Sequence, residues 1–364
     1  MVGSAVRRAL AARGYRNLLL RTHQELDLTD PAATRAFFER ERPQVVVLAA
    51  AKVGGILANW EQPYEFIYQN LAIELSVIEA AFRSGVRRLL FLGSSCIYPK
   101  LAPQPLREEY LLTGPLEETN RPYALAKIAG IELCRSLNRE YGTDYLSLMP
   151  TNLYGPGDNF DLRTSHVLPA LIRKFHEAKL GLPAEDGSPR PPHGPVTLWG
   201  TGSARREFLH VDDLADALCF LLERGHAITA TPGPTGTASA RSAGTARTPA
   251  PATTNPQADG LPAATGAHGA RIPAGLPDGL VNVGVGQDLT VRDLAALVQR
   301  VVGHEGEIIW DEEKPDGTPR KLLDVSRLQA LGWCPRIGLE EGIHMTYQWY
   351  LEHVAPSASA PVLP

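Results

Sequence analysis

Four side chains suited to proton transfer lie in two short stretches of the chain. The first stretch, residues 89–96, is an apolar run ending in Gly-Ser-Ser-Cys, which is typical of a buried parallel strand that delivers Ser94 and Cys96 to its carboxyl end. The second stretch begins at Pro122 and favours a helix over residues 123–141. On that helix Tyr123 and Lys127 are four residues apart and share one face.

The pattern predicts acid–base chemistry at a carbonyl group. An ammonium beside a phenol favours the phenolate, so we expect Lys127 to lower the pKa of Tyr123. Such a Tyr can give a proton to a carbonyl oxygen as hydride arrives at the carbon, while a Ser hydroxyl from the strand end binds the same oxygen. A Tyr and a Lys at this spacing are usually a solvated helix face. The preceding Gly-Ser-Ser strand end favours the catalytic interpretation.

This arrangement resembles the extended short-chain dehydrogenase/reductase family. Longer motifs narrow the resemblance to the branch that converts GDP-4-keto-6-deoxy-D-mannose into GDP-L-fucose. The motifs occupy residues 49–55, 91–100, 150–156, 206–213 and 314–321. The resemblance implies an α/β fold, in which a Rossmann-type doubly wound parallel sheet carries a smaller α+β substrate domain.

The resemblance and the composition together divide the chain. Residues 1–165 and 211–226 are expected to form the dinucleotide-binding domain, and residues 166–210 and 279–354 the nucleotide-sugar domain. Residues 227–278 are mostly Ala, Thr, Pro, Gly and Ser, with hardly a large apolar side chain, and are predicted to be a disordered insertion, as is the tail 355–364.

Composition excludes several classes of function. A net charge of -4 gives no reason to expect a nucleic-acid partner. No apolar run is long enough to span a membrane, and the first residues lack the hydrophobic region of a signal peptide. The four cysteines are dispersed, which favours free thiols in a reducing cytoplasm over a metal site. The resemblance implies a homodimer formed through helices that include the Tyr123 helix.

The amino-terminal segment departs from the family pattern. Residues 2–13 predict a helix and residues 17–20 a strand, whereas a dinucleotide-binding fold opens with a strand and a Gly-rich turn. The resemblance implies a G-x-x-G-x-x-G turn, of which only Gly3 is present. Either the start was assigned about a dozen residues too late, or the chain is shortened and impaired in cofactor binding. We favour the first explanation because the catalytic residues are kept.

Cofactor choice depends on charge after the strand at residues 17–20. A carboxylate there repels a ribose 2′-phosphate and an Arg attracts it, so Arg21 favours NADPH/NADP+, although relatives often carry Arg where His23 stands. The alternative interpretation of Asp27 and its neighbours is a surface loop with no role in cofactor binding. The resemblance implies these cofactor-binding residues: Gly3, Arg21, His23, Asp27, Leu28, Leu92, Gly93, Ser94, Ser95, Lys127, Pro150, Thr151, Asn152, Leu153 and His166.

The resemblance also implies the substrate contacts and the reaction. The expected GDP-sugar contacts are Lys174, Trp199, Arg206, Asp316 and Lys321. The reaction would be epimerisation at C3 and C5, followed by NADPH-dependent reduction of the C4 ketone. The catalytic residues would be Ser94, Cys96, Tyr123, Lys127 and His166. The residues alone leave open whether Ser94 or Ser95 faces the ketone, and the resemblance selects Ser94. Cys96 as thiolate base and His166 as imidazolium acid are the candidates for epimerisation. A thiolate near neutral pH needs a nearby positive charge, such as His166, or oriented dipoles.

Two alternatives remain open at this point. A nucleotide-sugar 4-epimerase or 4,6-dehydratase shares the fold and regenerates a tightly held NAD, but Cys96 beside Gly-Ser-Ser favours the epimerase–reductase. A catalytically silent nucleotide-sugar-binding protein follows if the missing first strand abolishes cofactor binding.

Other elements follow from local patterns. The apolar residues 45–50 predict a central parallel strand, and residues 31–40 a helix capped by Asp30. Asp212 is a cap candidate for the helix after residue 210, and Thr290 for the helix at 291–302.

Overall fold

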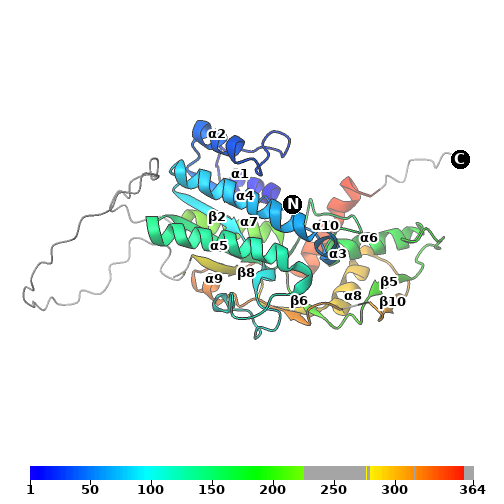
Figure 1. Cartoon of the computed structure of the whole chain (residues 1–364). Coiled ribbons are helices and arrows are strands. Elements are labelled where there is room, and N and C mark those ends of the chain that lie inside the picture. The colour runs from blue at the N-terminus through cyan, green and yellow to red at the C-terminus, as the bar shows by residue number, and fades with distance from the viewer. Residues whose placement is uncertain (225–275, 277–278, 315, 356–364) are drawn as a thin grey trace, which may run out of the picture.

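The computed structural model describes residues 1–224, 276, 279–314 and 316–355 (Figure 1). Apart from Leu276 and Ala355, the segments predicted to be disordered lie outside the described residues.

A parallel sheet carries the larger part of the molecule. Its strands are β1 (Val45–Leu48), β2 (Arg88–Leu92), β3 (Asp144–Pro150) and β8 (Leu280–Val283), in the order β1-β2-β3-β8. Strand β8, which the sequence analysis assigned to the smaller domain, therefore belongs to this sheet. Successive residues of β2 point to opposite faces, so Leu89 and Phe91 enter one core and Leu90 and Leu92 the other.

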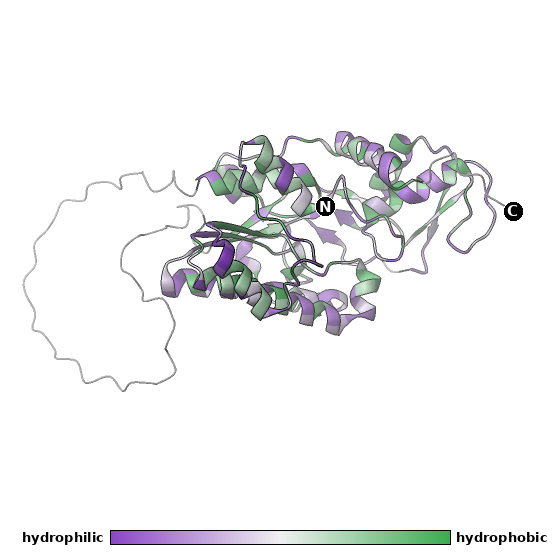
Figure 2. Cartoon of the chain, turned by 90° about the horizontal axis from the view of Figure 1, so that it is seen from above, coloured by the Kyte–Doolittle hydropathy of each residue, from purple (hydrophilic) through white to green (hydrophobic). Residues whose placement is uncertain are grey.

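Helices cover both faces of this sheet (Figure 1). One layer contains α2 (Pro31–Glu41), α4 (Pro63–Arg83) and α5 (Arg121–Tyr141); the other contains α1 (Val2–Ala12), α7 (Val211–Arg224) and α9 (Ser326–Ala330). These helices alternate hydrophobic and hydrophilic residues along their length (Figure 2), as expected for helices that bury one face. The predicted α/β, Rossmann-like class is confirmed.

Two predictions about this sheet are wrong. Strand β1 was expected in a central position, but it lies at the edge next to β2, and Val45 is 45% exposed. Residues 17–20 were expected to form a strand and do not. A strand needs a hydrogen-bonding neighbour, and the described strand nearest this edge, β1, pairs only with β2.

A smaller region packs beside the carboxyl ends of the strands. Its core lies between α6 (Val167–Leu180), α8 (Val291–Val302) and α10 (Leu339–His353), against the parallel pair β5 (Val196–Trp199) and β10 (Ile308–Asp311).

Short elements connect the two parts. Two small sheets are formed by β4 (Asn152–Tyr154) with β7 (Phe208–His210), and by β11 (Arg320–Lys321), β6 (Arg205–Arg206) and β9 (Leu289–Thr290). The remaining short helices are α3 (Ile56–Glu61), Ser95–Ile97, Glu108–Tyr110 and Glu118–Asn120.

The expected helix caps are partly confirmed. Asp30 accepts hydrogen bonds from the N–H groups of Ala32 and Ala33 at 2.8 and 3.1 Å, and Thr290 accepts one from Asp293 at 3.0 Å. Asp212 is not a cap, because α7 already begins at Val211.

Among the described helices, none is long and apolar enough to cross a membrane.

Candidate active site

The carboxyl end of β2 presents Ser94 and Cys96. After Gly93 the chain enters the short helix Ser95–Ile97, which Ser94 caps by accepting a hydrogen bond from the Cys96 N–H at 3.2 Å. The Ser94 hydroxyl is also near enough to the Tyr123 phenol to lower its pKa, whereas Ser95 is buried with 6% of its surface exposed. The strand end and the start of α5 therefore meet at Ser94.

Tyr123 lies in the first turn of α5, as predicted. Burial raises the pKa of its phenol, and negative charge at Cys96 and Glu74 raises it further, while the hydrogen bond from Ser94 opposes the shift. The prediction that Lys127 lowers the pKa of Tyr123 is wrong. The phenol keeps its proton at neutral pH.

Lys127 itself has a buried partner. The Lys127 ammonium lies 3.1 Å from the Glu74 carboxylate of α4, and both side chains are almost completely buried. Burial raises the pKa of Glu74 to about 7 even though Lys127 opposes the shift. Burial likewise lowers the pKa of Lys127, against the effect of Glu74.

Sequence reasoning missed Glu74, although a signal was present. The side chains of Asn70, Val77, Ile78 and Ala81 lie on the buried side of α4, and Glu74 falls within that stripe. A carboxylate inside an apolar helix face requires a partner, because an unpaired buried charge is very costly.

The Cys96 sulfur has a cationic neighbour that the sequence did not predict for it. Lys321 of β11 donates to the sulfur at 3.6 Å. Arg206 is near enough for negative charge at Cys96 and Asp316 to raise its pKa, although burial is the larger effect and lowers it. His166 was expected in this role, but the described contact with the sulfur is made by Lys321.

Two neighbouring strands hold these cations in place. Arg320 lies opposite Arg205, and Lys321 opposite Arg206, in the parallel pair β11–β6. Since successive strand residues point to opposite faces, Arg205 and Arg320 project away from the side that carries Arg206 and Lys321.

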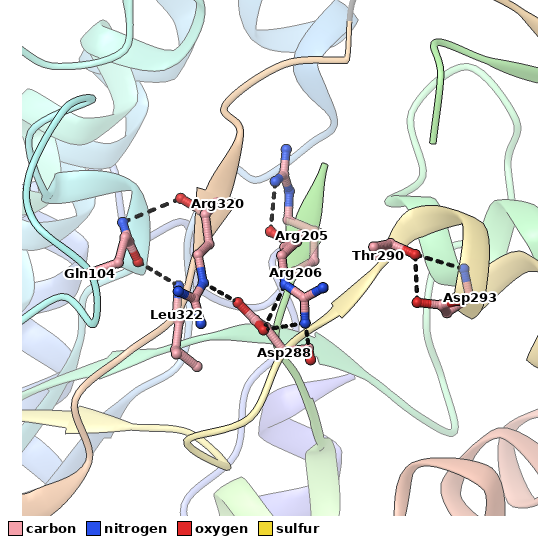
Figure 3. A network of polar contacts seen from close by, with 8 residues as sticks. All are labelled: Gln104, Arg205, Arg206, Asp288, Thr290, Asp293, Arg320 and Leu322. Atoms are coloured by element: carbon pink, nitrogen blue, oxygen red, sulfur yellow. Dashed lines mark hydrogen bonds and ion pairs between the residues drawn. The ribbon is translucent and has the colours of Figure 1, made fainter. Parts of the chain in front are cut away.

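Asp288 joins the outward-facing pair (Figure 3). Its carboxylate accepts hydrogen bonds from Arg205 Nε and Nη2 at 3.0 and 2.8 Å, and from Arg320 Nε. Gln104 ties β11 further, since it bonds the Arg320 carbonyl and the Leu322 N–H. Sequence reasoning also missed Asp288.

His166 is the N-cap residue of α6 and stays exposed. The groups packed around its ring and the Lys321 ammonium both lower the pKa of His166 below its usual range. The neutral imidazole is therefore favoured at neutral pH, where the sequence analysis expected imidazolium.

The other expected substrate contacts lie around the β5 turn. Asp316 accepts hydrogen bonds from the Thr201 N–H and hydroxyl at 2.8 and 2.7 Å. Trp199 is 58% exposed at the end of β5, and Lys174 is paired with Glu185 at 3.2 Å.

The cofactor residues expected after β3 are engaged with the backbone of Glu207. The Thr151 hydroxyl and the Asn152 amide both donate to the Glu207 carbonyl, at 3.2 and 2.8 Å. Pro150 ends β3, and Leu153 packs into the core beside α7. Leu92 and Gly93 lead into Ser94, so these residues share one edge of the sheet.

The residues expected at the adenine end are more dispersed. Arg21 is paired with Glu41 at 3.2 Å and lies over the Phe37 ring. His23 is highly exposed, and Asp27 accepts hydrogen bonds from the Thr29 N–H and hydroxyl. Leu28 packs against the core below α4, and Gly3 lies in the first turn of α1.

Comparisons with known proteins agree with this geometry. The model of the NAD dependent epimerase/dehydratase family matches residues 1–231. The chain is 49% identical over 354 residues to GDP-L-fucose synthase 1 of Arabidopsis thaliana, covering 97% of this chain and 91% of the relative. It is also 49% identical over 353 residues to GDP-L-fucose synthase of Escherichia coli (strain K12), covering 97% and 94%. The solved structure of the GDP-mannoheptose C4 reductase MlghC from Campylobacter jejuni with NADP bound superposes with a TM-score of 0.74 at 34% identity, covering 96% and 95%.

Proposed function

The chain belongs to the NAD dependent epimerase/dehydratase family and, within it, to the GDP-L-fucose synthases, and we propose that it converts GDP-4-keto-6-deoxy-D-mannose into GDP-L-fucose. The observation that carries this proposal is that two groups suited to proton transfer, Tyr123 and Cys96, lie at the carboxyl end of the same strand, β2. The Ser94 hydroxyl is near enough to the Tyr123 phenol to lower its pKa, and two residues further on Lys321 contacts the Cys96 sulfur.

The residues present fit NADPH. Nothing lies within 4 Å of where a Cβ of Gly3 would be, so the first turn of α1 leaves room for a pyrophosphate. The nicotinamide end would be held by Lys127, by Ser94 and Ser95, and by the backbone after β3. When bound, NADPH supplies the hydride for C4.

The reduction uses Tyr123 as the acid. Its raised pKa keeps the proton on the phenol at neutral pH, which is the state needed to protonate the C4 oxygen as the ketone becomes an alcohol. Ser94 donates to the same oxygen and so stabilises the negative charge that develops there.

The preceding epimerisation exchanges protons at C3 and C5. Protons next to a ketone become acidic when the developing enolate is stabilised, which Tyr123 and Ser94 do at O4. Cys96 removes a proton as thiolate, stabilised by the Lys321 ammonium. His166 returns a proton on the opposite face; its neutral imidazole must first take up a proton from water, and its lowered pKa makes the resulting imidazolium a stronger acid.

The test separates the two steps. Purified protein is incubated with GDP-4-keto-6-deoxy-D-mannose in D₂O without NADPH, and deuterium entering C3 and C5 is measured by NMR. NADPH is then added, and its oxidation is compared with the GDP-L-fucose formed. We expect one NADP+ for each product molecule; exchange without net NADPH oxidation would contradict the reductase assignment.

The assembly proposed is a cytoplasmic homodimer formed through α4 and α5. These helices pack against each other, and their outer surface exposes Tyr64, Tyr68 and Leu75 of α4 and Leu125 of α5. Exposed apolar side chains on neighbouring helices favour an interface. Leu75→Glu with Leu125→Glu should give a monomer in light scattering, whereas an unchanged mass would rule out this interface.

A further inference from the structure

The buried carboxylate of Glu74 has no role in the chemistry described so far. It is 1% exposed, and Lys127 is 2% exposed. Apart from Lys127, no described residue gives a hydrogen bond to either of its oxygens. Any effect of Glu74 on the reaction must therefore pass through the charge and position of Lys127.

The fold makes room for this contact. A Cβ on Gly130, three residues after Lys127 in α5, would lie 2.8 Å from Glu74 Oε2 and 2.5 Å from Phe91 Cζ. Only glycine therefore lets α4 approach α5 closely enough at this point. The Phe91 ring covers the other side of the ammonium, with its centroid 4.8 Å from Lys127 Nζ.

We infer that Glu74 is a positioning residue for the reduction, which keeps Lys127 charged and directed toward the Tyr123 end of the site. The inference rests on the proposed function and adds a residue to it. Lys127 Nζ lies 5.9 Å from the Tyr123 ring centroid, so a small displacement of the ammonium changes the field at the phenol.

The titratable groups facing Glu74 are few among the described residues. They are Lys127, Tyr123 and Cys134, all on α5. Burial raises the pKa of Cys134 to about 12, so it stays a neutral thiol across the useful pH range. The sheet contributes Phe91 and no charge, which leaves Glu74 and Lys127 as the charges that titrate against each other.

The decisive variant is Glu74→Gln, which keeps the shape and removes the charge. Burial then acts on Lys127 without an opposing carboxylate, so the ammonium loses its proton at lower pH. We expect the alkaline limb of the reduction rate to move to lower pH by about one unit. The KM for the GDP-sugar should stay unchanged, and Glu74→Asp should restore part of the wild-type profile.

A double-mutant cycle tests whether Glu74 acts through Lys127. If it does, adding Glu74→Gln to Lys127→Met causes no further loss of rate. Glu108→Gln is the matched control, because Glu108 is also buried and paired, with Arg327 at 3.4 Å, outside the site. It should lower stability and leave the pH profile in place.

Two results would overturn the inference: a pH profile of Glu74→Gln that coincides with wild type, or losses that add in the double mutant. A readout without substrate separates this from failure of the proposed function. The Kd of NADPH against pH should show the same shift in Glu74→Gln. If the wild-type protein binds NADPH but does not reduce the sugar, the proposed function is wrong. The pH dependence of the NADPH Kd then decides by itself whether Glu74 positions Lys127.

Discussion

The Lys321 ammonium lies 3.6 Å from the Cys96 sulfur, although the two residues are 225 positions apart in the sequence. The contact places an ammonium beside the sulfur that is proposed to remove a proton from the sugar. The contact joins the strand end after β2 to β11.

Lys321→Met should therefore slow epimerisation about 10- to 100-fold, the usual effect of losing a hydrogen bond to a charged group. The measurement is deuterium entry at C3 and C5. The rate of Cys96 alkylation by iodoacetamide, in a Cys334→Ser background, reports the reactivity of the sulfur directly. Lys179→Met is the control, since Lys179, in the last turn of α6, donates a hydrogen bond to the carbonyl of Val302 at the end of α8. Wild-type alkylation in Lys321→Met would refute the pairing.

Tyr123→Phe should reduce the rate of C4 reduction about 10²- to 10⁴-fold, because it removes the general acid. NADPH affinity should change little. Because burial raises the pKa of Tyr123, its deprotonation should not limit the wild-type rate at any pH up to its ordinary value of 10. A contradicting result would be a fall of the reduction rate below pH 10 that is unchanged in Glu74→Gln and absent in Tyr123→Phe. It would show that the Tyr123 phenol loses its proton below pH 10.

Asp288→Asn should raise the KM for the GDP-sugar about tenfold and lower the free energy of unfolding by about 2 kcal/mol, because it breaks charge-assisted hydrogen bonds to Arg205 and Arg320. Burial alone would raise the pKa of Asp288, but the hydrogen bonds from the two guanidinium groups outweigh it and hold the pKa below its ordinary value of 3.8.

The sign of the pH effect follows from that lowered pKa. The stability contributed by Asp288 is fully present above pH 3.8 and is lost as the pH falls through the folded-state pKa. Thermal unfolding of wild type and Asp288→Asn should converge in acid. Asp293 lies on the same segment, and among the described residues its hydrogen bonds are with Thr290 (Figure 3). Asp293→Asn should leave the KM unchanged; an equal rise would mean that the whole segment had shifted.

Local patterns predicted much of this molecule. Asp30 and Thr290 cap helices because the cap and its N–H partners are only two or three residues apart. Strand β2 and the start of α5 were identified for the same reason, since apolar runs, Pro122 and the Tyr-to-Lys spacing are all readable from neighbouring residues.

Features that depend on distant partners were missed. Glu74 has meaning only because Gly130 lets α4 approach Lys127, and Asp288 only because β11 lies beside β6. The edge position of β1 was missed because an apolar strand has the same sequence pattern at an edge as in the centre.

Gly130→Ala tests the close approach of α4 and α5. The new methyl carbon would lie 2.5 Å from Phe91 Cζ and 2.8 Å from Glu74 Oε2, so the helices or these side chains must move. The overlap should cost about 1–3 kcal/mol of unfolding free energy, which outweighs the helix propensity gained over glycine, about 1 kcal/mol. Reduction should slow as well, because Glu74 is displaced from Lys127. Denaturant unfolding and the reduction rate measure the two effects separately.

Adding Phe91→Leu should recover stability by making room for the methyl group, while the displacement of Glu74 persists and the rate stays low. If the double variant recovers the rate in full, the loss in Gly130→Ala came from Phe91 and not from Glu74.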